Sequence, residues 1–92
     1  MEIHVPGYSS KNGFTFNWEP GFSVKCTTCD IEGILEVRLE ANKQGLISLA
    51  RHLLELSQDS VPENYHIHLD EYGSLEEGST ELIIIKRSFD FG

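Results

Sequence analysis

The sequence predicts an α+β fold: an antiparallel β-sheet of about six strands, in the order ββββαββ, with one amphipathic helix packed on one face. Two patterns predict it. Apolar and polar side chains alternate with a period of two in the first half of the chain and again near its end, which is typical of strands, whereas the middle has the three- and four-residue spacing of a helix. A chain of 92 residues can bury one modest core, so we expect a single compact domain over residues 1–92.

Four strands are expected before the helix. Turn-forming pairs separate the first three of them, namely Pro6-Gly7, Asn12-Gly13 and Pro20-Gly21, because proline presets φ for a turn and Asn and Gly tolerate positive φ. Apolar and charged side chains alternate along the last and longest one, as in a sheet with one covered face. The four expected strands are Glu2–Val5, Phe14–Trp18, Phe22–Cys26 and Ile31–Glu40.

The helix is expected from about Asn42 to Ser57. Asn42 is a favourable N-cap, because its side-chain oxygen can accept a hydrogen bond from a free N–H of the first turn, although Gly45 lowers the helix propensity there. An apolar helical stripe has to be buried, so we expect it to lie on the sheet. The stripe comprises Leu46, Ile47, Leu49, Ala50, Leu53, Leu54 and Leu56, and the covered sheet face comprises Leu35, Val37, Leu39, Tyr65, Ile67 and Leu69.

Two strands, Tyr65–Leu69 and Glu81–Lys86, are expected after the helix, with the polar loop Asp70–Ser79 between them. The first strand alternates, which places His66 and His68 on the face opposite its apolar side chains. The second contains Leu82, Ile83, Ile84 and Ile85 in sequence, a run that is typical of a central strand with both faces at least partly covered.

The chain is acidic, with 15 Asp and Glu against 7 Lys and Arg and a net charge of −8. This balance argues against binding nucleic acid or an anionic membrane, both of which require basic residues. No Lys or Arg lies between Arg51 and Lys86, so the eight acidic residues in that interval account for the whole excess. The chain has no visible targeting signal and no apolar run that could span a bilayer, so we expect a cytoplasmic protein.

Two residue sets could carry chemistry. Cys26 and Cys29 have the spacing of a zinc or redox pair, and His66 and His68 could complete a Cys2His2 site. However, Cys29 is expected in a turn, the motif does not open a helix, and two outward histidines are ordinary on a strand. We therefore expect neither a metal nor a cofactor and keep a metal-binding protein as an alternative.

A catalytic interpretation would use His66, His68 and Asp70 as an oriented base. The nucleophile would have to be one of Ser74, Ser79, Cys26 and Cys29. No nucleophile elbow or glycine-rich phosphate loop accompanies them, and a core this small makes a deep pocket improbable. We therefore expect that the protein is not an enzyme.

The loop after the histidines indicates a recognition surface. It combines carboxylates with one embedded aromatic side chain, a combination that suits a basic protein partner. The alternative is an ordinary solvated surface. The residues in question are Asp70, Glu71, Tyr72, Glu76 and Glu77, with His66 and His68 next to them.

The sheet face opposite the helix is a second candidate surface. It is expected to show Glu36, Arg38, His66 and His68 together with two of the apolar residues from Leu82 to Ile85. An apolar pair among polar neighbours can mark a contact with another protein or with a second copy. The alternative function is therefore a structural or oligomerising module. Such a module could form a homodimer through the Leu82–Ile85 strand. For this face, the alternative is that the N-terminal strands, with Phe14, Phe16 and Trp18, fold over it.

From Leu39 onward the chain resembles a family of small bacterial immunity proteins found beside polymorphic toxins. The resemblance rests on the order and spacing of several short pieces: Leu39-Glu40-Ala41-Asn42-Lys43-Gln44-Gly45-Leu46, Leu49-Ala50, Leu53-Leu54, Leu56, His66-Ile67-His68-Leu69-Asp70, Leu75, Gly78-Ser79 and Glu81-Leu82-Ile83-Ile84. It implies a cytoplasmic protein that binds and silences a cognate toxin without catalysis. With the acidic loop, it predicts occlusion of a basic toxin active site, such as that of a nuclease.

Overall fold

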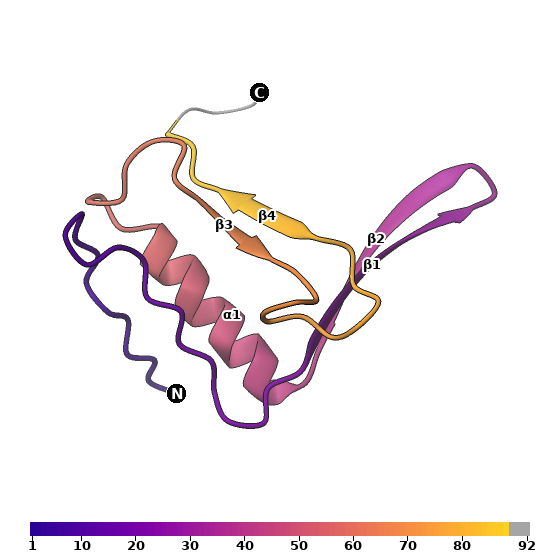
Figure 1. Cartoon of the computed structure of the whole chain (residues 1–92), viewed down its shortest axis with the longest axis horizontal. Helices are drawn as coiled ribbons and strands as arrows, with labels where there is room; N and C mark the ends of the chain where they lie inside the picture. Colours follow the sequence, from indigo (N-terminus) through magenta and orange to yellow (C-terminus); the bar gives the residue numbers. More distant parts are fainter. Residues whose placement is uncertain (89–92) are drawn as a thin grey trace.

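The structure is a computed structural model and describes residues 1–88. Its elements are β1 (Val24–Ile31), β2 (Ile34–Ala41), α1 (Lys43–Leu56), β3 (His66–Leu69) and β4 (Leu82–Ile85) (Figure 1). The α+β class is confirmed, but the single sheet of about six strands is wrong. Within the described residues the strands form two separate antiparallel pairs, β1 with β2 and β3 with β4.

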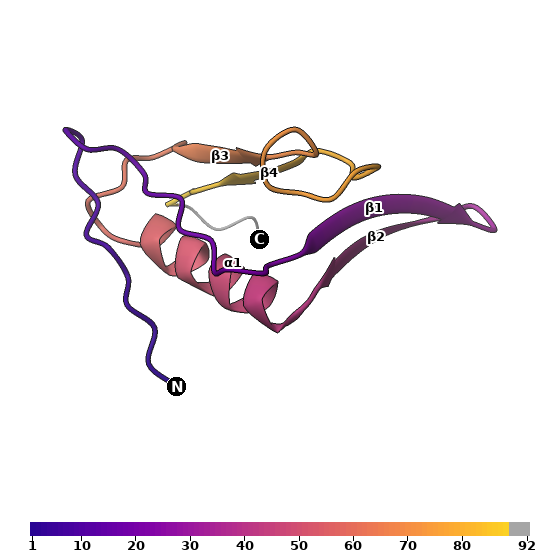
Figure 2. The same cartoon turned by 60° about the horizontal axis from the view of Figure 1, so that its bottom comes forward.

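The helix and the β3–β4 pair form the body of the molecule, and the β1–β2 hairpin extends away from it (Figures 1 and 2). The loop before β4 joins the two sheets: Glu76 N–H donates to the Val24 carbonyl (2.8 Å) and Thr80 N–H to the Cys26 carbonyl (2.7 Å). The small core lies at this junction and comprises Val24, Cys26, Leu49, Leu69 and Leu75.

The hairpin turn lies at Glu32 and Gly33, where the sequence predicted continuous strand. Both residues have positive φ (54° and 84°), as a two-residue hairpin turn of type I′ requires, and the Asp30 carboxylate accepts the Gly33 N–H at 2.9 Å. The expected turn at Cys29 is therefore wrong, because β1 runs through it without a break. Glutamate is an unusual residue for the first position of such a turn, so the pair Glu32-Gly33 is a weak signal.

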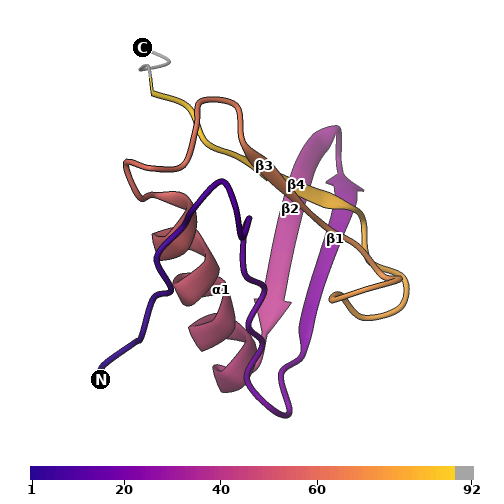
Figure 3. The same ribbon diagram turned by 60° about the vertical axis from the view of Figure 1, so that its left-hand side comes forward.

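The N-terminal segment contains no strand, so the predicted strands Glu2–Val5 and Phe14–Trp18 are wrong; of the described residues before β1, only Ser9 and Gly13 form an isolated bridge. Instead the segment runs alongside α1 (Figures 1 and 3). Three of its backbone N–H groups, two residues apart, donate to side chains of the helix: Thr15 to Glu55 Oε2 (2.7 Å), Asn17 to His52 Nε2 (2.9 Å) and Glu19 to Ser48 Oγ (2.8 Å).

The face of α1 that receives this segment is polar. Ser48, Arg51, His52 and Glu55 follow the i, i+3, i+4, i+7 spacing of one helical face, and each is at most 8% exposed. We call these four side chains the buried polar face. Arg51 holds the segment further, since its guanidinium donates to the carbonyls of His4 and Asn17 and pairs with Glu19.

The predicted burial of the leucine stripe is therefore only partly right. Leu49 and Leu56 are buried, but Leu46, Leu53 and Leu54 are 55%, 48% and 48% exposed. The strand row expected beneath them is also open, with Leu35, Val37 and Leu39 70%, 66% and 48% exposed. The reason is the hairpin geometry: within residues 1–88, β1 and β2 pair only with each other, and they project beyond the helix.

The helix begins as the sequence predicts, with Asn42 as the N-cap. Its side-chain oxygen accepts the N–H of Gly45 (2.8 Å) and also that of Ser23 (3.0 Å), so the cap joins the helix to the start of β1. The contact is close at Gly45, where a Cβ would lie 2.6 Å from the Ser23 carbonyl oxygen and 2.8 Å from a Val24 methyl.

His52 is the central side chain of the buried polar face. The rings of Trp18, Phe16 and Phe14 surround it at centroid distances of 4.6, 5.6 and 6.0 Å. Burial, together with the neighbouring Arg51 charge, lowers the pKa of His52 from 6.5 to about 4. The imidazole is therefore neutral at pH 7, which leaves Nε2 free to accept the Asn17 N–H.

The His52 environment predicts a specific loss of stability in mild acid. Because its folded-state pKa lies below the unfolded value of 6.5, the stabilisation is complete above pH 6.5 and is lost as the pH falls toward about 4. His52→Gln keeps an acceptor but does not titrate. Urea unfolding is measured at several pH values between 7 and 4. We expect the free energy of unfolding of the wild type to fall over this range by up to about 3 kcal/mol more than that of the variant. If the free energies of unfolding of the two proteins changed with pH in the same way, the lowered pKa of His52 would be contradicted.

The close approach at Gly45 predicts that Gly45→Ala destabilises the protein despite the better helix propensity of alanine. Overpacking against a backbone carbonyl costs about 1–3 kcal/mol, which exceeds the gain of about 1 kcal/mol from propensity. Gly73→Ala is the matched control, since a Cβ there meets nothing nearer than 3.7 Å. Urea unfolding midpoints measure both variants, and an equal or higher midpoint for Gly45→Ala would refute the close contact.

Candidate functional site

The outer face of the β3–β4 pair carries the two histidines. Ile67 and Leu69 are buried, whereas His66 and His68 are exposed, as the alternation predicted. The register places His66 opposite Ile85 and His68 opposite Ile83, and these isoleucines are 43% and 45% exposed. The expected face is therefore right for the histidines and the apolar pair, but wrong for Glu36 and Arg38, which lie on β2 in the other sheet.

Each histidine has a local hydrogen-bond partner. His66 Nδ1 lies 3.0 Å from the carbonyl oxygen of Asn64, and His68 Nδ1 lies 3.0 Å from Glu81 Oε1 on the neighbouring chain segment. The two imidazole rings are 5.1 Å apart and meet edge to face. These contacts orient both rings on the sheet surface.

The acidic loop, which we define as residues 70–79, follows β3 directly and is held by its own hydrogen bonds. The carbonyl of Asp70 accepts the N–H groups of three residues that follow it, Gly73, Ser74 and Leu75, and its carboxylate accepts that of Tyr72 at 3.1 Å. Leu75 is only 5% exposed and anchors the loop in the core. The loop therefore has a defined shape despite its polar sequence.

Its acidic side chains differ in what they contact. Glu71 accepts the Gly78 N–H at 2.7 Å, and Glu76 accepts the Ser23 hydroxyl at 2.9 Å, so both help to hold the loop in place. Among the residues that the structure describes, the side chains of Tyr72 and Glu77 make no hydrogen bond or ion pair, and Tyr72 is 91% exposed. These two groups are available to a partner.

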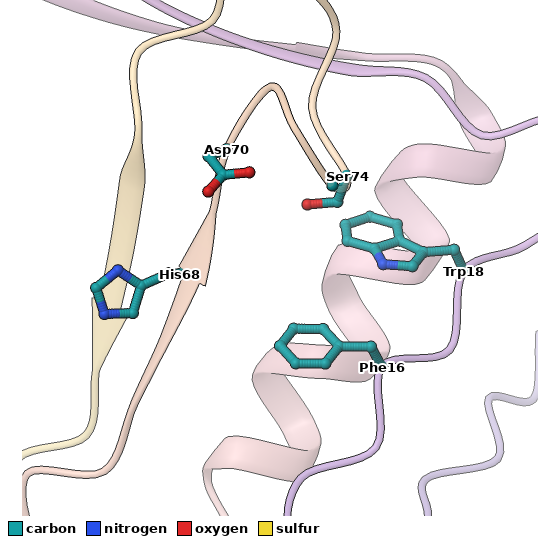
Figure 4. Close-up of a pocket in the computed structure, with 6 residues that line it drawn as sticks. Phe16, Trp18, His68, Asp70 and Ser74 are labelled. Carbon is teal, nitrogen blue, oxygen red and sulfur yellow. The ribbon is translucent and has the colours of Figure 1, made fainter.

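A shallow pocket of about 230 Å³ lies beside the loop, lined by Phe16, Trp18, His68, Asp70, Gly73 and Ser74 (Figure 4). The rings of Phe16 and Trp18 point across it from the N-terminal segment. Sequence reasoning missed both aromatic side chains as site residues, because they were assigned to a strand. Nothing in their sequence pattern indicates that they face the loop.

The pocket does not assemble the residues of the catalytic interpretation that the sequence argued against. The His68 ring points away from Ser74, and the Asp70 carboxylate accepts a backbone N–H of its own loop (Figure 4). Within residues 1–88, His68 hydrogen-bonds to Glu81 and not to Asp70 or Ser74. A nucleophile activated by a base requires a hydrogen bond between the two, and this arrangement does not provide it.

The two cysteines lie on opposite faces of β1, because they are three residues apart on one strand. Cys26 is buried in the core at 2% exposure, and Cys29 is partly buried on the other side. They cannot bind one metal ion together in this geometry. The described part of the chain contains no group of three or more His, Cys, Asp or Glu side chains arranged for a metal.

No helix within residues 1–88 is long and apolar enough to cross a membrane. A search of curated proteins and a search of solved structures find no match. A family model described as Immunity protein 32 matches residues 36–88, which is more than half of the chain and covers most of β2 and all of α1, β3, the acidic loop and β4. The chain therefore belongs to the Immunity protein 32 family.

Proposed function

We propose that this protein binds a cognate toxin in the cytoplasm and neutralises it by covering the toxin's active site, without catalysis. Membership of an immunity protein family carries the general part of the proposal. The acidic loop carries the specific part, because it combines exposed carboxylates with the most exposed aromatic side chain of the described residues.

The distribution of acidic residues supports the proposal that the partner is basic. The eight acidic residues between Arg51 and Lys86 include Asp70, Glu71, Glu76 and Glu77 of the loop. A concentrated negative potential raises the association rate with a positively charged protein and opposes association with an acidic one. A toxin that acts on nucleic acid has such a positive surface at its active site, so a nuclease is the partner class that fits best.

The shape of the loop also supports a docking role. Its backbone is ordered by the hydrogen bonds of Asp70 and by buried Leu75, so little conformational entropy is lost when a partner binds. Tyr72 projects from this ordered base and can insert into a pocket of the partner, as aromatic anchors do at protein interfaces. His66 and His68, on the adjoining strand, extend the same surface.

The metal-binding alternative has little support, because Cys26 and Cys29 face opposite sides of β1. The oligomerising alternative has more support, since the open faces of the β1–β2 pair and of the β3–β4 pair both carry apolar side chains. Association through the Leu82–Ile85 strand would use the open face that also carries His66 and His68, so it would compete with toxin binding at that face.

Variants at the two unengaged loop side chains test the proposal. We expect Tyr72→Ala to weaken binding to the cognate toxin domain by roughly thirtyfold, the effect of losing an interface anchor. Glu77→Gln should slow association and reduce its dependence on salt. Calorimetry with an inactivated toxin domain, together with stopped-flow association rates, measures both effects.

Asp59→Asn is the matched control, because it removes one charge from the same acidic stretch outside the loop. We expect it to leave the affinity nearly unchanged. Asp70 is a poorer probe than Glu77, since its carboxylate also orders the loop backbone. Unaltered affinity and salt dependence in both loop variants would show that the toxin binds elsewhere.

A further inference from the structure

The β1–β2 hairpin has one engaged edge and one open edge. The loop before β4 bonds to β1 through the carbonyls of Val24 and Cys26, and the Cys26 N–H donates to Ser79 Oγ. Figure 2 shows β2 on the side of the hairpin away from that loop. Among the described residues, the backbone hydrogen bonds of residues 34–40 are those of the β1 ladder, so the outer edge of β2 is free to pair.

The sequence along this edge is an inverted repeat of side-chain types. Val37 lies at its centre, Glu36 and Arg38 flank it, and Leu35 and Leu39 lie outside them. When two such strands pair antiparallel about Val37, each Glu36 lies opposite an Arg38 and each Leu35 opposite a Leu39. Opposite charges and matched aliphatic pairs stabilise neighbouring antiparallel strands.

Other registers are less favourable. A shift of the centre to Arg38 places Arg38 opposite its own copy and Glu36 opposite Glu40, and a shift to Glu36 places two glutamates together. Like charges directly opposite each other are destabilising. If the two-fold axis lies between two residues of β2, the apolar side chains of one strand lie on the same face as the charged side chains of the other. A centre at Leu39 also avoids both faults, because it places Arg38 opposite Glu40, but it pairs only residues 37–41 of each β2. The pairing about Val37 engages residues 34–40 and is the longest register with neither fault.

The exposed groups support the same pairing. Leu35, Val37 and Leu39 form one apolar row, at 70%, 66% and 48% exposure, which the helix does not cover. Glu36 and Arg38 form an exposed ion pair within the chain at 3.3 Å and can exchange partners without being buried. Antiparallel pairing also places the two bodies at opposite ends of the shared sheet, because each body adjoins the Ala41 end of its own β2.

From these observations, we propose that two copies of this chain associate through their β2 edges, antiparallel about Val37, to form a four-stranded sheet in the order β1-β2-β2-β1. This interface differs from the predicted one through the Leu82–Ile85 strand. It is also independent of the acidic loop, so toxin binding and dimerisation can fail separately.

Charge reversal tests the pairing. We expect sedimentation equilibrium from micromolar to millimolar concentration to show a monomer–dimer equilibrium. Arg38→Glu replaces two opposite-charge pairs by two like-charge pairs and should weaken the dimer about tenfold or more. The double variant Glu36→Arg with Arg38→Glu recreates the inverted repeat with reversed signs and should recover the wild-type constant to within about threefold. Glu40→Gln is the control, because Glu40 lies opposite uncharged Ile34 across the proposed interface and so makes no charge pair there.

Cross-linking tests the register, in a Cys29→Ser background that leaves only buried Cys26. Val37→Cys places two thiols at the symmetry axis, where opposite Cα atoms are about 4.5–5.5 Å apart, within disulfide range. Leu35→Cys places them about 13 Å apart, too far to bond. We expect a covalent dimer from the first variant only, on mild oxidation.

A protein that stays monomeric at all concentrations would overturn the proposal. So would a dimer that is indifferent to Arg38→Glu, which would indicate association through another surface such as the Leu82–Ile85 strand. Preferential cross-linking of Leu35→Cys would refute the register. Thermal unfolding of each variant, monitored by circular dichroism, verifies that the monomer fold is retained.

Discussion

The hydrogen bonds between the buried polar face of α1 and the N-terminal segment determine much of this structure. A segment that lies against a helix has no strand beside it, yet its buried N–H groups still need acceptors. Ser48, His52 and Glu55 supply them. The spacing approximately suits this role, since three or four residues of helix rise about 4.5–6 Å and two residues of extended chain span about 6.6 Å. One helix face thus serves the segment as a neighbouring strand would.

The contact is reciprocal. Burying a histidine, a glutamate and an arginine in a small core is unfavourable unless each has a partner. The segment provides partners for His52 Nε2, Glu55 Oε2 and the Arg51 guanidinium through backbone N–H groups, backbone carbonyls and Glu19. Its aromatic rings then exclude water from His52. Within residues 1–88, the buried atoms His52 Nδ1 and Glu55 Oε1 have no hydrogen-bond partner. Neither the polar face nor the segment is satisfied alone, so the two must form together.

The sequence predicted the helix and its N-cap correctly because Asn42 and the leucine spacing act locally. It predicted the buried side only in part, because a leucine stripe normally faces the core, whereas here tertiary hydrogen bonds bury Ser48, His52 and Glu55 beside Leu49 and Leu56. Alternation at Phe14, Phe16 and Trp18 indicated a strand, since a period of two cannot show whether the partner is a strand or a helix. The location of the acidic loop followed from charge, but only the structure distinguishes engaged Glu71 and Glu76 from unengaged Glu77.

The side chains of the helix bind the N-terminal segment mainly through the main chain of the segment. At Thr15 and Asn17 the groups held are N–H donors, which every residue except proline possesses, and both side chains face solvent. Substitutions at these two positions can therefore alter the outer surface of the segment without disturbing its attachment. Backbone groups anchor the segment, and the side chains of Thr15 and Asn17 form its outer surface. The composition of this strip of surface is therefore free to diversify.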